Sequence, residues 1–219
     1  MPRSPFDPPF EKLPASLPIF PLPGAIVMPR AQLPLNIFEP RYLNMVSDAV
    51  AGDRLIGMVQ PDTRSPGRAG EAVCGTGTAG RITAFSETDD GRFLIRLTGL
   101  CRFDVEKEIP TTRGYRRVAV SWERFACDYD DEARIADRHG LLARIRRYAA
   151  PRRLEIDWQG LGGMPDALLV NLMVTSLPLE PPDRQALVET LALDDRARLL
   201  GQLLDLAQEG PTRSPPRAH

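Results

Sequence analysis

One glycine pattern in the sequence has the spacing of a dinucleotide-binding loop. Gly75, Gly77 and Gly80 follow the order G-x-G-x-x-G, in which glycines let a pyrophosphate approach the N-terminus of a helix. That chemistry requires a strand before the glycines and a helix after them. Residues 81–85 (RITAF) are instead typical of a strand, so we expect the glycines to permit a bend or a bulge. The pattern therefore predicts no bound cofactor.

Both lysines lack the neighbours that ATP hydrolysis or peptide hydrolysis would need. A P-loop places its lysine directly after a glycine, whereas Lys12 and Lys107 each follow a glutamate. A serine–lysine peptidase needs a lysine that is removed from water beside the nucleophile. Lys107 lies between two glutamates, and Lys12 lies in a proline-rich N-terminal segment. The sequence therefore predicts neither an ATPase nor a peptidase site.

Histidines, cysteines and acidic residues give no further candidate for catalysis or metal binding. His219 ends the chain and His139 precedes a glycine in an arginine-rich segment, so no histidine triad is predicted. The acidic run 128–132 lacks the central glycine and spaced glutamate of a calcium loop. The cysteines are odd in number and form no C-x-x-C pair, which disfavours disulfides and zinc: Cys74, Cys101 and Cys127. We predict no catalytic residue, cofactor or metal.

Length, charge and hydropathy bound the class of protein. A chain of 219 residues can form one large domain or two small ones, and its net charge of -1 gives no overall attraction to nucleic acid. No apolar run approaches the roughly 20 residues that cross a bilayer. The proline-rich N-terminus does not have the pattern of a signal sequence. We predict a soluble, cytoplasmic protein with no membrane partner, and the sequence leaves its oligomeric state open.

An arginine-rich stretch keeps RNA binding open as an alternative. Acidic residues interrupt the stretch, and no series of aromatic residues is present on which single-stranded bases could stack. A solvated helix face is therefore the favoured interpretation, and nucleic acid is a disfavoured partner. The stretch comprises Arg134, Arg138, Arg144, Arg146, Arg147, Arg152 and Arg153.

The hydrophobic period divides the chain into parts. Residues 1–15 and 210–219 are rich in proline and polar residues, and we expect them to be disordered tails. Apolar residues alternate with a period of two over most of residues 16–125, which predicts short strands in a curled mixed sheet. Residues 126–209 follow a helical period, which predicts a small helical bundle. The expected fold class is α+β.

The most distinctive segment runs from residue 17 to residue 42. An apolar run over residues 24–28 predicts a buried strand, and a second extended run over residues 33–38 leads directly into a helix. Pro40 suits the first helical position, because the amide there has no partner within the helix. The order strand, strand, helix, joined by prolines, is specific enough to compare with known families.

This segment resembles the opening of the Lon N-terminal domain, the substrate-binding domain of the ATP-dependent protease Lon. The matching stretches are PIFPLPG at 18–24, LPLNIFEPRY at 33–42, GDRLIGMVQP at 52–61 and the region 74–105. The resemblance covers roughly residues 16 to 206. It implies a PUA-like β-barrel or curled sheet followed by helices, in a stand-alone bacterial member without ATPase and peptidase domains. It also implies a binding role rather than chemistry.

The strand-to-helix corner is the predicted binding site for peptide segments. One interpretation is purely structural, with Phe38 and Tyr42 packing inward at the corner. In the other, apolar residues beside the corner form a groove for an extended or unfolded peptide, and the two interpretations are compatible. The predicted site comprises Met28, Pro29, Leu33, Leu35, Phe38, Arg41 and Tyr42.

These observations predict a non-enzymatic protein that binds unfolded or exposed protein segments. The role would be substrate recognition or that of an adaptor in protein quality control, with a cellular protease as a further candidate partner. An RNA-binding module and a small-molecule-binding protein remain the alternatives.

Overall fold

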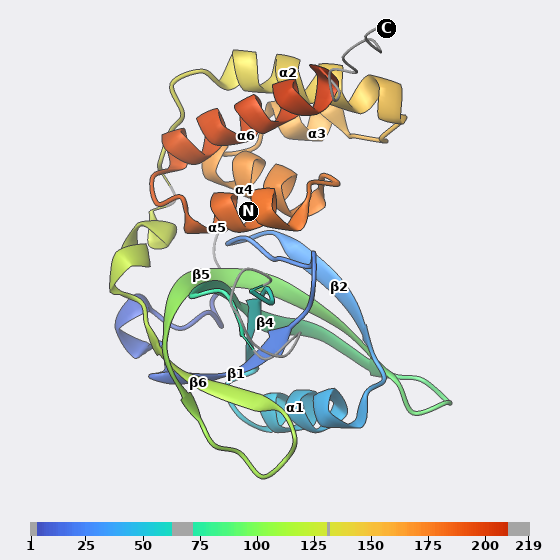
Figure 1. Cartoon of the computed structure of the whole chain (residues 1–219), viewed down its shortest axis with the longest axis vertical. Coiled ribbons are helices and arrows are strands. Elements are labelled where there is room, and N and C mark those ends of the chain that lie inside the picture. The colour runs from blue at the N-terminus through green and yellow to red at the C-terminus, as the bar shows by residue number, and fades with distance from the viewer. Residues whose placement is uncertain (1–3, 63–71, 131, 210–219) are drawn as a thin grey trace, which may run out of the picture.

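A mixed six-stranded sheet forms the first half of the chain. The computed structural model describes residues 4–62, 72–130 and 132–209 (Figure 1). The sheet has the order β2-β5-β4-β3-β1-β6, in which β1 and β3 are parallel and the other neighbours are antiparallel. The strands are β1 (Ser16–Pro21), β2 (Gln32–Ile37), β3 (Leu55–Val59), β4 (Thr76–Glu87), β5 (Phe93–Ile109) and β6 (Arg116–Ser121).

The long strand β5 curls this sheet. Its first part pairs with β4 from Phe93 to Asp104, and its last part pairs with β6 from Asp104 to Ile109. Register shifts interrupt both ladders, and such bulges bend a strand and increase its twist. Figure 1 shows the resulting curved sheet, with the β4–β5 hairpin extending beyond the other strands. The predicted fold class, α+β with a curled mixed sheet followed by helices, is confirmed.

The glycine pattern at residues 75–80 lies at the start of β4, and a strand follows it as expected. Gly77 is required by packing rather than by a ligand. A Cβ atom added there would lie 2.6 Å from the carbonyl oxygen of Met58 and 2.7 Å from a methyl group of Val59. Gly75 has no such neighbour within 4 Å. Gly77 therefore lets β4 lie against β3.

Helix α1 (Pro40–Ala51) covers one face of the sheet. Pro40 occupies its first turn, and the buried residues Tyr42, Met45, Val46 and Ala49 recur at helical spacing. They pack with sheet residues such as Ile82 and Leu97 in one hydrophobic cluster. We call this covered side the inner face of the sheet, and the opposite side of β2, β5 and β4 its outer face.

The second half of the chain is helical. Figure 1 shows these helices stacked at the end of the sheet opposite α1. The carboxylate of Asp137 accepts from the Gly140 amide and that of Asp157 accepts from the Gly160 amide, so each caps a helix N-terminus. After a 3-10 segment (Glu123–Tyr129), the helices are α2 (Arg138–Arg152), α3 (Trp158–Gly162), α4 (Asp166–Ser176), α5 (Pro181–Glu189) and α6 (Leu193–Glu209).

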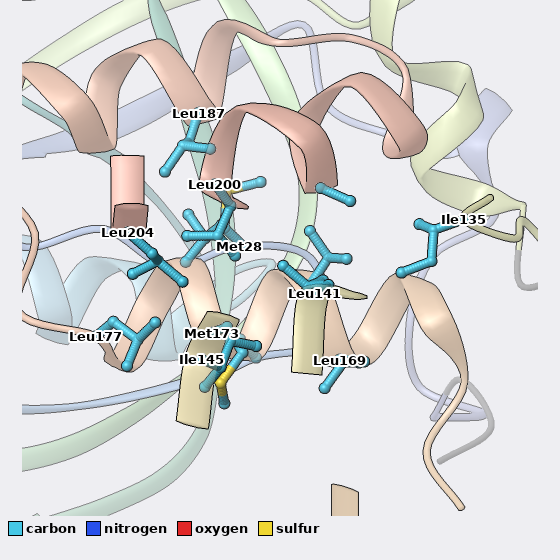
Figure 2. Close-up of a cluster of buried hydrophobic side chains, with 14 of the residues drawn as sticks. Met28, Ile135, Leu141, Ile145, Leu169, Met173, Leu177, Leu187, Leu200 and Leu204 are labelled. Carbon is cyan, nitrogen blue, oxygen red and sulfur yellow. The ribbon is translucent and has the colours of Figure 1, made fainter. Parts of the chain in front are cut away.

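The expected strand over residues 24–28 does not form. This segment has no strand pairing of its own, and Gly24 adopts a φ of +70°. Its side chains nevertheless alternate: Ile26 and Met28 enter the helical core, whereas Val27 enters the core beneath α1. Figure 2 shows Met28 among leucines of the bundle. Alternate side chains of this segment enter two different hydrophobic cores, which explains its period of two without a paired strand.

Residues 4–15 differ from the expected loose tail, because their apolar side chains find a place on the sheet. A 3-10 turn (Phe10–Lys12) lets Phe10 and Leu13 pack against a hydrophobic cluster of the sheet. The indole nitrogen of Trp122 also donates to the Pro14 carbonyl at 2.9 Å. The expected tail 210–219 lies outside the described residues, and the boundary between 125 and 126 stays a proposal.

Candidate functional site

Met28 and Pro29 of the predicted peptide site join the sheet to the helices. The Met28 side chain is fully buried, and its amide donates to the Thr175 hydroxyl at 3.1 Å. The Pro29 carbonyl accepts from the Asn171 amide group at 3.1 Å. A side chain without exposed surface cannot contact a peptide in this conformation, so Met28 would support a binding surface only from inside.

The corner residues divide between packing and exposure. Tyr42 is buried, its ring lies 4.2 Å from that of Phe20, and burial raises the pKa of its hydroxyl. Arg41 pairs with Glu39 at 2.8 Å and lies over the Tyr42 ring, so its cation is held locally. Phe38, by contrast, is 64% exposed. Of these corner residues, Phe38 therefore presents apolar surface to a partner.

Leu33 and Leu35 lie on β2, with alternate strand residues facing opposite sides. Both are partly buried against the cluster beneath α1, which places them on the inner face. The structure thus spreads the seven predicted residues over three environments: the helical junction, the inner face and the strand-to-helix corner, where Tyr42 is buried and Phe38 is exposed. Their joint role as a peptide site remains a proposal.

The structure also shows an exposed apolar surface that the sequence reasoning missed. Leu94 is 45% exposed and Phe85 is 44% exposed, although both lie in strands. They border a shallow hollow of about 490 Å³, which we call the tip hollow. A signal was present in the sequence, since Leu94 is an apolar residue at a position that alternation assigns to the solvent side. The tip hollow is lined by residues 34–36, 84–86 and 94–96.

Strand register identifies the outer-face side chains around the tip hollow. Asn36 pairs with Leu94, and Leu94 pairs with Ser86. Pro34 and Ala84 lie two residues further along the same face, on either side of Arg96. Exposed apolar side chains that gather around a hollow are candidates for contact with another molecule.

A second, polar recess lies on the outer face between the tip hollow and the helices. It has a volume of about 770 Å³, and we call it the arginine cleft. The register places Gln32, Thr98 and Arg81 in one cross-strand row of its floor. Arg96 lines both the arginine cleft and the tip hollow, so the two recesses adjoin at this residue. The arginines of the cleft are Arg30, Arg54, Arg81 and Arg96.

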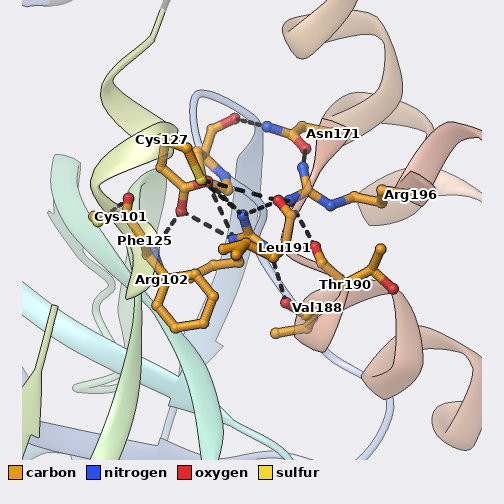
Figure 3. Close-up of polar contacts among 11 residues, drawn as sticks. Cys101, Arg102, Phe125, Cys127, Asn171, Val188, Thr190, Leu191 and Arg196 are labelled. Carbon is orange, nitrogen blue, oxygen red and sulfur yellow. Dashed lines mark hydrogen bonds and ion pairs between the residues drawn. The ribbon is translucent and has the colours of Figure 1, made fainter. Parts of the chain in front are cut away.

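A buried polar cluster joins the sheet to the helices (Figure 3). Arg102, fully buried on β5, pairs with Asp128 at 2.7 Å and donates to the carbonyls of Val188, Thr190 and Leu191. Burial lowers the pKa of the nearby Arg196 to about 9. The hollow beside them is only about 80 Å³, and the Arg102 donors are engaged within the protein. This cluster is therefore structural.

The arginine-rich stretch contributes to the cohesion of the bundle. Arg144 and Arg147 both pair with Asp205 on α6. Arg138 pairs with Asp166 on α4, and Arg152 donates to the Ala207 carbonyl. These contacts hold α2 against α4 and α6. They leave fewer guanidinium groups for phosphates than the sequence alone suggests.

Within the three described ranges, no group of three or more histidine, cysteine, aspartate or glutamate residues could hold a metal ion. Nor does any helix of these ranges have the length and apolar character needed to cross a bilayer.

Comparisons with known proteins agree with this fold. Residues 16–205 match the family described as the ATP-dependent protease La (LON) substrate-binding domain. The chain is 26% identical to the Lon protease of Flavobacterium johnsoniae over 192 residues, which are 85% of this chain and 23% of that protein. It is 27% identical to the Lon protease of Anaeromyxobacter dehalogenans over 210 residues, 91% of this chain and 24% of that protein. The chain thus spans about a quarter of the length of these relatives.

Solved structures extend the comparison to three dimensions. A Lon N-terminal domain protein from Xanthomonas campestris superposes with a TM-score of 0.61 at 27% identity, covering 87% of this chain and 97% of that one. The N-terminal domain of the Mycobacterium avium complex Lon protease gives a TM-score of 0.60 at 15% identity, covering 87% and 98%. The second similarity concerns the fold alone.

Proposed function

The chain belongs to the family of Lon substrate-binding domains, and from this premise we propose that it binds exposed apolar segments of other proteins at the end of β2 and the β4–β5 hairpin. The observation that carries the proposal is the exposure there of three large apolar side chains, Phe38, Phe85 and Leu94. We name the proposed surface the apolar tip, and it comprises Pro34, Leu35, Phe38, Ala84, Phe85 and Leu94. In this proposal Met28, Pro29, Leu33 and Tyr42 support the surface from within, and Arg41 borders it.

The chemistry of the apolar tip suits weak and permissive recognition. Burying one exposed leucine or phenylalanine side chain contributes about 1.5–3 kcal/mol. A dissociation constant of 1 μM corresponds to about −8 kcal/mol, and association also has a large entropic cost. Two or three such contacts therefore give at best micromolar binding, with little dependence on the order of residues in the bound segment.

Side-chain contacts support this proposal better than strand addition does. Among the described residues β2 pairs only with β5, so it is an edge strand. Pro34 lies in the middle of β2 and has no amide hydrogen to donate. Proline in an edge strand is one of the features that prevent pairing with another chain. An added strand would therefore find an interrupted row of donors.

The proposed role is recognition without catalysis. Delivery of the bound segments to a cellular protease, as an adaptor in protein quality control, forms the further part of this proposal. Co-purification of a protease with the wild-type chain, lost in a variant of the apolar tip, would support it.

Binding to a fluorescently labelled unfolded protein, measured by anisotropy at 150 mM salt, tests the recognition proposal. The variants Leu94→Ser and Phe85→Ser remove apolar surface from the two faces of the hairpin. We expect each to weaken binding by about 3- to 10-fold, because burying the exposed half of such a side chain is worth about 0.7–1.4 kcal/mol.

The matched control is Leu206→Ser on α6, where the leucine is 64% exposed and distant from the hairpin in the chain. It should bind as the wild type does. Equal loss in all three variants, or no binding of unfolded protein by the wild type at micromolar concentrations, would contradict the proposal. Binding that falls steeply with salt and requires RNA would favour the alternative function.

A further inference from the structure

We infer that the arginine cleft binds acidic side chains that flank the apolar anchor of a bound protein segment. The inference rests on the proposed function, because it assigns the neighbouring recess to the same bound chain. It adds a substrate class: segments with aspartate or glutamate a few residues from an apolar residue.

The cleft gathers cations from four separate parts of the chain. Arg96 and Arg81 project from β5 and β4 on the outer face, in adjacent cross-strand rows. Arg54 immediately precedes β3, and its carbonyl accepts from the Ile82 amide at 2.8 Å, which fixes it beside β4. Arg30 precedes β2, and its amide donates to the Gly99 carbonyl at 2.7 Å. Guanidinium groups bind carboxylates in a bidentate manner, so this arrangement suits an acidic partner.

The local charge balance favours an anion. The described lining contains four arginines and two aspartates, an excess of two positive charges. Asp7 is engaged by Arg81 at 2.9 Å, and both side chains are largely buried. In the described part of the chain, the guanidinium groups of Arg54 and Arg96 have no hydrogen-bond or ion-pair partner. These two exposed cations are available to a bound segment.

The backbone on both sides of the cleft is held in an uncommon conformation. Arg30 has a φ of 67° and Arg54 a φ of 59°, a region that residues other than glycine adopt only at an energetic cost. At Gly99 an added Cβ atom would lie 2.1 Å from the Met28 carbonyl oxygen, so this glycine permits the Arg30 segment to approach β5. The fold thus holds two cleft arginines in defined places rather than on loose loops.

The position of the tip hollow next to the cleft indicates which part of a bound segment would reach the arginines. Arg96 and Leu94 lie two residues apart on the same face of β5, a spacing of about 6.6 Å in a strand. An extended segment advances by the same amount over two residues. A bound chain whose apolar anchor contacts Leu94 therefore brings a side chain two to four residues away over Arg96 and Thr98. An acidic residue at that position matches the charge of the cleft.

Three labelled peptides test the inference by anisotropy at 50 and 300 mM salt. The first carries a leucine–phenylalanine anchor with four acidic residues beginning two positions away, and the second replaces the acidic residues with glutamine and asparagine. The third keeps the acidic residues and replaces the anchor with serine. We expect the wild type to bind the first peptide about 5- to 10-fold more tightly than the second at low salt. Salt should reduce this advantage.

Arg54→Gln and Arg96→Gln should each reduce the ratio of affinities for the first and second peptides to about 3-fold or less. The affinity for the second peptide should stay unchanged. The matched control, Arg198→Gln on α6, removes another exposed arginine and should leave the preference for the first peptide intact. Because Arg54 and Arg96 are exposed, we expect both variants to fold. Circular dichroism and thermal unfolding verify this.

Each other outcome separates the two proposals. Equal affinity for the first two peptides overturns the inference and leaves the proposed function standing. Failure of both to bind overturns the proposed function and the inference with it. If the third peptide, which lacks the apolar anchor, binds as tightly as the first, the cleft does not bind acidic residues as part of an anchored segment. That result overturns the inference. Inorganic pyrophosphate that binds more tightly than the first peptide would assign the cleft to small anions instead, which also overturns it.

Discussion

Arg102 of β5 and Arg196 of α6 donate hydrogen bonds to the same carbonyl oxygen, that of Thr190, at 2.6 and 3.0 Å (Figure 3). Thr190 follows the last residue of α5, where helix carbonyls lack partners within the helix and carry partial negative charge. Asp128 supplies the full negative charge that two neighbouring buried cations require. One point thus joins a strand of the sheet to two helices of the bundle, beside the arginine cleft.

Arg102→Met should lower the free energy of unfolding by about 3–5 kcal/mol. The substitution keeps much of the side-chain volume but removes the guanidinium that pairs at 2.7 Å with Asp128, whose side chain is 4% exposed. Urea unfolding followed by circular dichroism measures the change. Arg116→Met is the control, because the Arg116–Glu108 pair is partly exposed and should contribute less than about 1 kcal/mol. Similar losses of unfolding free energy in the two variants would show that the buried Arg102–Asp128 pair contributes no more to stability than a partly exposed pair.

Arg196 should make the stability of the protein rise with pH in the alkaline range. Burial lowers the pKa of Arg196 from its usual range to about 9, so the folded protein releases this proton at a lower pH than the unfolded chain does. Below pH 9 Arg196 is charged in the folded protein, and the burial of this charge lowers the free energy of unfolding by its full amount. Above pH 9 the unfolded chain binds more protons than the folded one, and stability increases.

The measurement compares the wild type with Arg196→Met, which lacks the titrating group, by urea unfolding at pH 8, 9 and 10. The difference in free energy of unfolding should shift in favour of the wild type by about 1 kcal/mol from pH 9 to pH 10. A constant difference over this range would mean that the Arg196 proton is retained in the folded state.

Two glycines of one motif should respond differently to alanine. In Gly77→Ala the new methyl group would lie 2.6 Å from a backbone oxygen, so a strand must shift, and we expect a loss of about 1–3 kcal/mol. In Gly75→Ala the methyl group meets no atom within 4 Å, and the change should stay within about 0.5 kcal/mol. Thermal unfolding of the two variants tests this directly. A larger loss at Gly75 than at Gly77 would contradict the packing explanation of the glycine pattern.

Much of the fold was predictable because its signals are local. The period of two in β5 and the proline at the start of α1 identified these elements, and the α+β class followed. The role of Met28 was not predictable in this way. It depends on Thr175, which is 147 residues away, and no local period reports such a contact.

The candidate surfaces show the same limit of sequence reasoning. The arginines that are crowded in the sequence, such as Arg144 and Arg147, pair with Asp205 in the bundle. The arginines of the cleft lie at positions 30, 54, 81 and 96, and only the pairing of distant backbone segments brings them together. Density of charge along the chain was therefore a poor guide to density of charge in space.

The segment before β1 should contribute measurably to stability, contrary to the expectation of a loose tail. Phe10 packs against a cluster of the sheet and its ring lies edge-on to Tyr129 at 5.5 Å, whereas Phe6 is 80% exposed. Phe10→Ala removes buried apolar surface, and we expect a loss of about 1–3 kcal/mol. Phe6→Ala deletes the same side chain four residues earlier and should change the free energy of unfolding by less than about 0.5 kcal/mol. Urea unfolding of the pair measures the contrast. The two variants delete the same side chain from the same segment. A significant loss of unfolding free energy only in Phe10→Ala would establish that the proline-rich segment packs as part of the domain. Equal small effects in both variants would support the interpretation as a loose tail.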